Sequence, residues 1–164
     1  MIKDWQPHTT ADILQLYSDT LEELRRREVL RSANNPSGDY GELLFSRAFG
    51  WQLQNNSSSG YDAINGDGVR YQIKCRRITP RNSSRQLSFI RNLPVNPFDI
   101  LAGVLLDQKF KVLRAALVPV AVVQEKATYV KHVNAWRMIL RDSVWDIPGV
   151  QDVTSELRAI EQSL

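Results

Sequence analysis

Two long apolar runs constrain the fold of this chain more than any other sequence feature. They cover residues 98–106 and 110–118, with only Asp107-Gln-Lys between them. Apolar runs of this length, bounded by polar residues, are typical of strands inside a sheet, so we expect two central strands here. The predicted order of elements (helices, strands, helix, strands, helix) favours a single α/β sandwich around a mixed sheet.

Helix patterns dominate the first fifty residues. Apolar residues recur at helical spacing over residues 10–31, where Thr10 is the predicted N-cap. Pro36 and Gly50 are typical of a helix start and end, which predicts a second helix from Pro36 to Phe49. The other expected elements are a strand over 51–54, a polar loop over 55–60, a hairpin of strands 61–64 and 69–78, short helices over 83–92 and 119–126, edge structure over 129–140 and 144–147, and a final helix capped by Thr154.

Size and composition indicate one globular domain, because 164 residues can bury a single core. We expect an N-terminal helical segment over 10–33, a core over 35–118, and an extension over 119–164 packed on that core. No apolar run has transmembrane length, the first residues lack a signal-peptide core, and a single cysteine, Cys75, excludes an internal disulfide. These features predict a cytoplasmic protein with no membrane partner.

Positive charge is concentrated in one segment, although the net charge is only +3. Residues 68–98 contain no Asp or Glu, and the rest of the chain is net negative. A local basic zone of this kind indicates either a polyanion partner or a solvated basic loop, and its composition favours neither. Its seven cations are Arg70, Lys74, Arg76, Arg77, Arg81, Arg85 and Arg91.

Residues 60–77 contain the motif with the clearest chemical meaning. Side chains alternate along a strand, so Gln72 and Lys74 share the polar face of the predicted strand 69–78. A carboxylate, an amide oxygen and the backbone carbonyl of Ile73 are hard ligands that suit Mg²⁺ or Mn²⁺. If Asp62 shares that face, the hairpin can hold such an ion beside a lysine, which is the chemistry of phosphodiester hydrolysis.

The turn of the hairpin decides whether Asp62 shares this face. If Ile64 pairs with Val69, Asp62 faces the core. If Gly66-Asp67-Gly68 is instead a three-residue loop with Gly68 in the left-handed conformation, Asn65 pairs with Val69 and Asp62 lies opposite Gln72. We favour the second register, because a buried unpaired carboxylate is costly.

These residues resemble the PD-(D/E)xK nuclease superfamily. Asp62 matches its first acid, Gln72-Ile73-Lys74 stands in place of (D/E)-x-K, and Glu42 matches its helical glutamate. Gln-x-Lys followed by basic residues is similar to the Mrr-type branch of restriction endonucleases. The resemblance implies a restriction endonuclease-like mixed β-sheet flanked by helices, with an αβββαβ core that covers residues 35–118.

The resemblance also implies roles. Asp62, Gln72, Ile73 and Glu42 would hold Mg²⁺ or Mn²⁺, and Lys74 would be the catalytic lysine of a DNA endonuclease in restriction or DNA repair. Cleavage of both strands would require a homodimer or two binding events. Tyr61 replaces the family's proline, and Gln72 removes a charge that would strengthen metal binding. The implied DNA-binding residues are Arg70, Arg76, Arg77, Arg81, Arg85 and Arg91.

Two other functions fit the same residues. One is a nuclease-like fold that binds DNA without cutting it, and the other is a partner-binding accessory domain of a restriction system. Glu42 also has an alternative role as a solvent-facing helix residue. Asp99 is expected to be a strand-end residue, and Cys75 an inert buried thiol.

Overall fold

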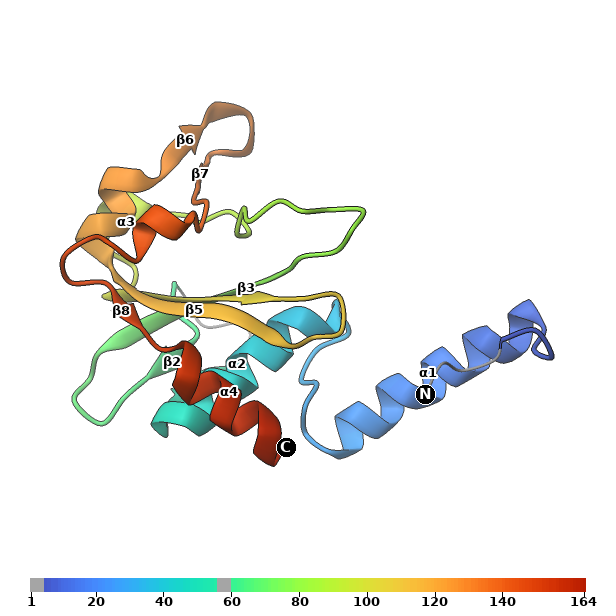
Figure 1. Ribbon diagram of the computed structural model, residues 1–164. Coiled ribbons are helices and arrows are strands. Elements are labelled where there is room, and N and C mark those ends of the chain that lie inside the picture. Colours follow the sequence, from blue (N-terminus) through green and yellow to red (C-terminus); the bar gives the residue numbers. More distant parts are fainter. Residues whose placement is uncertain (1–4, 56–59) are drawn as a thin grey trace.

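A six-stranded, mainly antiparallel sheet forms the centre of the protein, as the computed structural model of residues 5–55 and 60–164 shows (Figure 1). The strand order is β1-β2-β3-β4-β5-β8, and β3 and β4 are the one parallel pair among the described strands. The two apolar runs form the central strands β4 and β5, which confirms the mixed α/β class predicted from the sequence. The strands are β1 (Gln52–Leu53), β2 (Ala63–Ile64), β3 (Arg70–Arg77), β4 (Ile100–Leu106), β5 (Val112–Pro119) and β8 (Gln151–Asp152).

Both faces of the sheet are covered (Figure 1). Helices α2 (Pro36–Phe49) and α4 (Thr154–Ser163) bury one face with a core that includes Phe45, Ile73 and Leu157. The other face packs against α3 (Val120–Lys126) and extended chain, with a second core that includes Leu87 and Met138. A separate two-stranded ribbon, β6 (Thr128–Val130) and β7 (Ala135–Arg137), lies above this second face.

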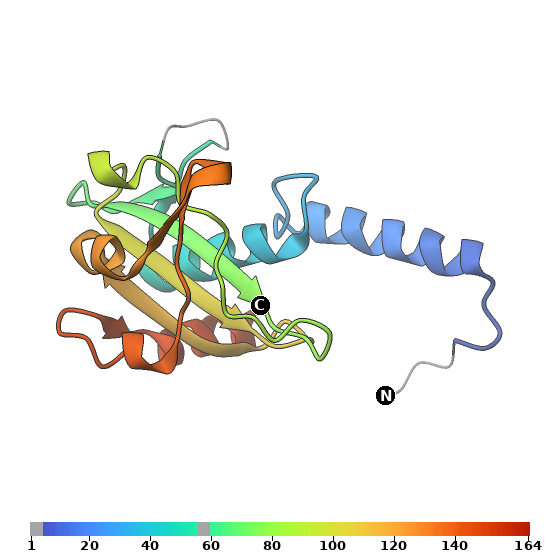
Figure 2. The same cartoon turned by 90° about the horizontal axis from the view of Figure 1, so that it is seen from above.

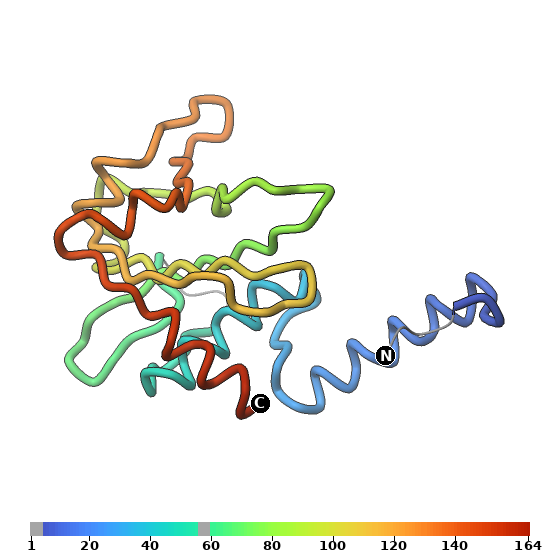
Figure 3. The backbone as a smooth tube through the Cα atoms, viewed as in Figure 1, coloured from blue at the N-terminus to red at the C-terminus, as the bar shows by residue number. Residues whose placement is uncertain are grey.

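The segment between β3 and β4 is extended, so the helix predicted over 83–92 is wrong (Figure 3). Ile90 exchanges two backbone hydrogen bonds with Trp136, of 2.8 and 2.9 Å, and Gln86 forms a bridge to Ile139. These partners satisfy the backbone groups that a helix would have paired internally. The connection contains only a 3₁₀ turn, η1 (Leu93–Val95), so the second helix of the expected αβββαβ order is absent.

Several element ends differ from the predicted ones. Helix α1 spans Thr10–Arg26, and its N-cap is Thr9. The Thr9 hydroxyl oxygen accepts from the Asp12 amide, and the Asp12 carboxylate accepts from the Thr9 amide, which completes a capping box. Thr154 is the first residue of α4 rather than its cap. The predicted edge structure after β7 contains a 3₁₀ turn, η3 (Asp142–Val144), and a second such turn, η2 (Lys131–Val133), joins β6 to β7. The middle of the predicted polar loop 55–60 lies outside the described residues.

Helix α1 extends away from the rest of the protein, and no residue of it is buried (Figure 2). None of the helices formed by the described residues combines the length and the apolar character needed to cross a membrane.

The contact of α2 with β3 depends on Gly41. A Cβ atom at this position would lie 2.8 Å from Cβ of Cys75 and 3.5 Å from Cγ1 of Val104. We expect Gly41→Ala to lower the free energy of unfolding by about 1–3 kcal/mol, because the helix must move away from the strand. Urea unfolding measures this change.

Gly38→Ala is the matched control, since it lies in the same helix and has no atom within 4 Å of the added methyl group. Its stability should be unchanged or higher by up to about 1 kcal/mol. Equal stability of the two variants would show that the close approach at Gly41 does not constrain the helix.

Candidate active site

The hairpin turn has the register that the sequence favours. Ala63 pairs with Tyr71 and Ile64 with Arg70, and the Asn65 amide donates to the Val69 carbonyl over 3.2 Å. Gly68 has a φ of 81°, in the left-handed region that glycine adopts without strain. Beyond Ala63 this register does not continue, because the Asp62 amide donates to the Tyr71 carbonyl over 2.8 Å. The Asp62 carboxylate nevertheless accepts from Nε2 of Gln72, so the two side chains share one face, as predicted.

Asp62 lies at an open edge of the sheet. Strand β2 has two residues, so among the described residues no strand neighbours β3 on this side beyond Tyr71. Oδ2 of Asp62 accepts a 2.6 Å hydrogen bond from the Ile73 amide and a second one from Nε2 of Gln72. Because the N–H and C=O of one strand residue point to the same edge, the Ile73 carbonyl also points toward the edge that Asp62 occupies.

Glu42 is connected to the same edge through Arg31. One guanidinium nitrogen of Arg31 is 3.1 Å from Oε2 of Glu42, and another donates to the Gln54 carbonyl over 2.8 Å. The Gln54 amide in turn donates to the backbone carbonyl of Asp62 over 2.9 Å. Glu42 is therefore part of the cluster and not a fully solvated helix residue, since its side chain is only 18% exposed.

Arg31 is a residue that the sequence analysis missed. It belongs to no motif, and it falls at the end of the helix predicted over 10–31. The buried Asp39 fixes its backbone by accepting 2.8 Å hydrogen bonds from the amides of Arg31 and Ser32. Nothing in the spacing of these residues signals that Arg31 reaches Glu42.

Partial dehydration shifts the pKa values of Glu42, Asp62 and Lys74 toward the neutral forms of these groups. Burial, and then the nearby Asp62 carboxylate, raise the pKa of Glu42 to about 7 against the opposing effect of Arg31. Burial also raises the pKa of Asp62, although the Ile73 amide, Lys74 and Gln72 favour its charged form. Burial lowers the pKa of Lys74, which Asp62 and Glu42 partly offset. Opposed shifts of this kind are concentrated at functional sites.

Lys74 lies near both acids without forming an ion pair. No carboxylate oxygen of residues 5–55 and 60–164 is within 4.0 Å of its Nζ, and Nζ makes no hydrogen bond to them. The described residues contain no buried side-chain nitrogen or oxygen without a partner, so water must still reach this amine. A largely dehydrated amine without a fixed partner is available to a bound ligand.

The donor atoms at the edge fit a hard divalent cation. Within the described part of the chain, Oδ1 of Asp62 and Oε1 of Glu42 accept no hydrogen bond, so each has free lone pairs. Gln72 presents its nitrogen to Asp62 and keeps its amide oxygen for another partner. The described residues include no cluster of three or more His, Cys, Asp or Glu side chains placed to hold a metal, so the set needs the amide and carbonyl oxygens.

Most of the arginines expected to bind DNA have partners inside the protein. Arg70 holds Asp99 at the start of β4 with two hydrogen bonds, of 2.8 and 3.1 Å, which agrees with the strand-end role predicted for Asp99. The Arg76 guanidinium donates to the Ser84 carbonyl and to the side-chain oxygen of Asn82. Arg77 lies over the Phe110 ring and donates to the Gln108 carbonyl, and Arg85 pairs with Asp142 over 2.8 Å. Arg81 and Arg91 are exposed and form no ion pair with the described residues.

Cys75 has no role at this edge. Its side chain points to the opposite face of β3 and packs against α2. Burial raises the pKa of the thiol to about 12, which keeps it protonated and unreactive, as the sequence predicts.

Comparisons with known proteins add no family to this geometry. No family model matches the chain, and no curated protein matches it. The residues at the sheet edge are therefore the basis for inferring its function.

The raised pKa of Glu42 predicts a specific pH dependence of stability. Between pH 4.5 and about 7 the unfolded chain ionises this group while the folded protein keeps it protonated, so stability falls as the pH rises through this window. We expect Glu42→Gln to match the wild type near pH 4.5 and to exceed it by about 1–3 kcal/mol above pH 7. Urea unfolding of both proteins across this range measures the gap. A constant gap at all pH values would contradict the raised pKa.

Proposed function

We propose that this protein is a Mg²⁺- or Mn²⁺-dependent endonuclease that hydrolyses DNA phosphodiester bonds in restriction or DNA repair. We further propose that it is a member of the PD-(D/E)xK superfamily whose restriction endonuclease-like core lacks the helix between β3 and β4. The observation that carries this proposal is the unpaired, largely dehydrated Lys74 beside two carboxylates at an open sheet edge. This arrangement is unfavourable for the protein alone and favourable when a cation and a phosphate join it.

Asp62 is the principal ligand of the proposed cation, helped by Glu42 and the Ile73 carbonyl. The amide oxygen of Gln72 would be a further ligand. When bound, the cation would neutralise the phosphate and lower the pKa of a water molecule. Its positive charge would favour the ionised forms of Asp62 and Glu42.

Lys74 orients the attacking water or stabilises charge on the phosphoryl oxygens. Its position near both acids, without a fixed ion pair, leaves its donors free for this contact. Arg31, which contacts Glu42 and the Gln54 carbonyl at the same edge, would be placed to contact a neighbouring phosphate.

A second candidate function is DNA binding without cleavage. The observation that favours it is that both acids already have internal partners, Gln72 and Ile73 for Asp62 and Arg31 for Glu42. With one carboxylate fewer than (D/E)-x-K supplies, such a site could fail to retain a cation. Cleavage assays separate the two functions.

The first test is cleavage of supercoiled plasmid DNA with Mg²⁺ or Mn²⁺ and with EDTA. We expect metal-dependent nicking that falls at least about 100-fold in Asp62→Asn and in Lys74→Met. Lys74→Met keeps the shape of the side chain and removes a dehydrated amine, so its fold should be at least as stable as the wild type.

Asp67→Asn is the matched control for Asp62→Asn, since it makes the same chemical change at an exposed residue of the same hairpin. It should keep full activity. Undiminished DNA binding without cleavage in either metal would favour the second candidate, and cleavage that persists in Lys74→Met would exclude the proposed site.

The second test concerns the two exposed arginines of the basic segment. If Arg81 and Arg91 contact phosphates, the double alanine variant should reduce the slope of log affinity against log salt by about 2, since each contact contributes about 0.9. Fluorescence anisotropy with a labelled duplex at several salt concentrations measures the slope. Replacing Arg47 and Lys126, which lie on α2 and α3, removes the same charge and should leave the slope unchanged. Equal slopes for both double variants would show that Arg81 and Arg91 do not contact DNA phosphates.

A further inference from the structure

Helix α1 leaves an apolar face uncovered. Along it Ile13, Leu14 and Tyr17 are 38, 62 and 59% exposed, and the same face continues through Leu21 and Leu24. A single helix of about this length is marginal in water, and in proteins its stability comes mainly from packing of the apolar face. The exposed half of α1 therefore needs a covering surface.

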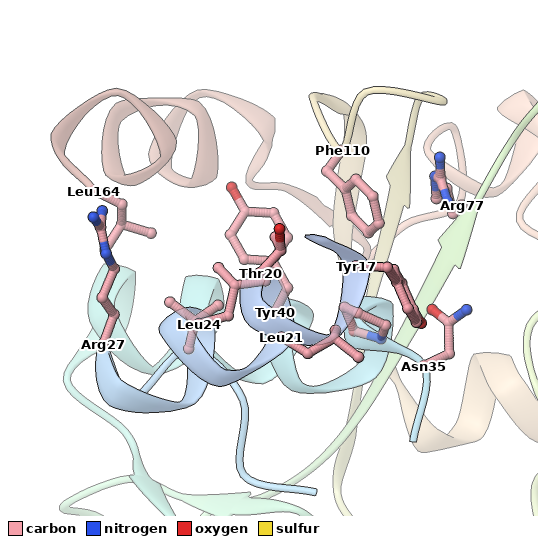
Figure 4. Close-up of a pocket in the computed structure, with 12 residues that line it drawn as sticks. Tyr17, Thr20, Leu21, Leu24, Arg27, Asn35, Tyr40, Arg77, Phe110 and Leu164 are labelled. Atoms are coloured by element: carbon pink, nitrogen blue, oxygen red, sulfur yellow. The ribbon is translucent and has the colours of Figure 1, made fainter. Parts of the chain in front are cut away.

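An apolar groove continues from this face onto the body of the protein (Figure 4). It has a volume of about 500 Å³. One wall is the second half of α1, with Tyr17, Leu21 and Leu24, and the other wall comes from α2, the β4–β5 turn and the C-terminus. The second wall includes Pro36, Tyr40, Phe110 and Leu164.

We propose that α1 of a second copy of this chain fills the groove, in an antiparallel, two-fold symmetric pair. Apolar residues recur along α1 at i, i+4, i+8 and i+11, from Ile13 to Leu24, and the last three of them line the groove. The exposed first half of one α1 therefore matches the groove beside the second half of the other. Two-fold symmetry lets each copy supply both the inserted segment and the groove. Both exposed surfaces are then covered at once.

The charges of α1 select the second copy as the occupant and set its direction. Residues 10–19 contain Asp12 and Asp19 and no cation, whereas residues 20–27 contain three arginines, Arg25 to Arg27, against two glutamates. An antiparallel pair places the acidic half of each helix beside the basic half of its partner, and a parallel pair places like charges together. The antiparallel arrangement also places the partly positive N-terminus of each helix beside the partly negative C-terminus of the other, which is favourable.

This inference does not rest on nuclease activity, because the groove and the sheet edge involve different residues. Its test is the mass of the full-length protein by size-exclusion chromatography with light scattering over a range of concentrations. We expect a dimer, twice 18.8 kDa, for the wild type. A double variant Leu14→Asp, Tyr17→Asp should have the mass of a single chain, since both side chains are exposed and their replacement leaves the core intact.

The double variant Ala11→Asp, Gln15→Asp is the control, because it adds the same two charges on the exposed polar side of α1 and should keep the dimer. A monomeric wild type at all concentrations, or a dimer that survives the substitution of Leu14 and Tyr17, overturns the proposal. A monomeric wild type that binds an unrelated protein through α1 would also overturn it.

Cysteine cross-linking tests the direction of the helices without disturbing the apolar face. In a mixture of Thr10→Cys and Arg27→Cys chains, oxidation should join the two different chains, because antiparallel helices bring residue 10 beside residue 27. Cross-linking of Thr10→Cys chains to one another would indicate a parallel pair and contradict the proposal. The protonated Cys75 thiol should not react.

Discussion

The hydrogen bond from the Ile73 amide to Oδ2 of Asp62 is the interaction on which the candidate site depends. In a longer β2, a backbone carbonyl would accept from this amide and the carboxylate would have no place at the edge. Because β2 contains only Ala63 and Ile64, the edge of β3 is left to a side chain. The three-residue turn with Gly68 left-handed determines which side chain that is, since a shift of one residue would turn Asp62 to the other face.

The electrostatics of this edge are unfavourable for the folded protein by itself. Two carboxylates and an amine are partly removed from water, and of these three groups only Glu42 has an ion-pair partner, Arg31, among the described residues. Partly dehydrated charges that are not paired reduce stability. The two hydrophobic cores on either face of the sheet can offset this cost. Under the proposed function, a bound cation and a phosphate would neutralise these charges.

The parts of this structure that local sequence determines were predictable. The central strands follow from two mainly apolar runs, and the turn of the hairpin follows from the glycine at position 68, which adopts the left-handed conformation. The contacts made between distant residues were not. Leu87 and Ile90 are three residues apart, a spacing that fits a helix, but they belong to extended chain whose partners, Trp136 and Ile139, lie about fifty residues later. The contact of Arg31 with Glu42 likewise depends on Asp39 holding the segment before α2, which no periodicity reveals.

The same Asp39 contacts keep the site independent of what covers α1. The segment that joins α1 to α2 carries Val29 in the apolar groove and Arg31 at the sheet edge, only two residues apart. Between them Leu30 is 5% exposed, and Asp39 binds the amides of Arg31 and Ser32. Buried packing and charge-assisted hydrogen bonds from the body therefore fix the backbone of residues 30–32 within the same chain. The position of Arg31 beside Glu42 is therefore a property of one chain, whether or not a second copy lies in the groove.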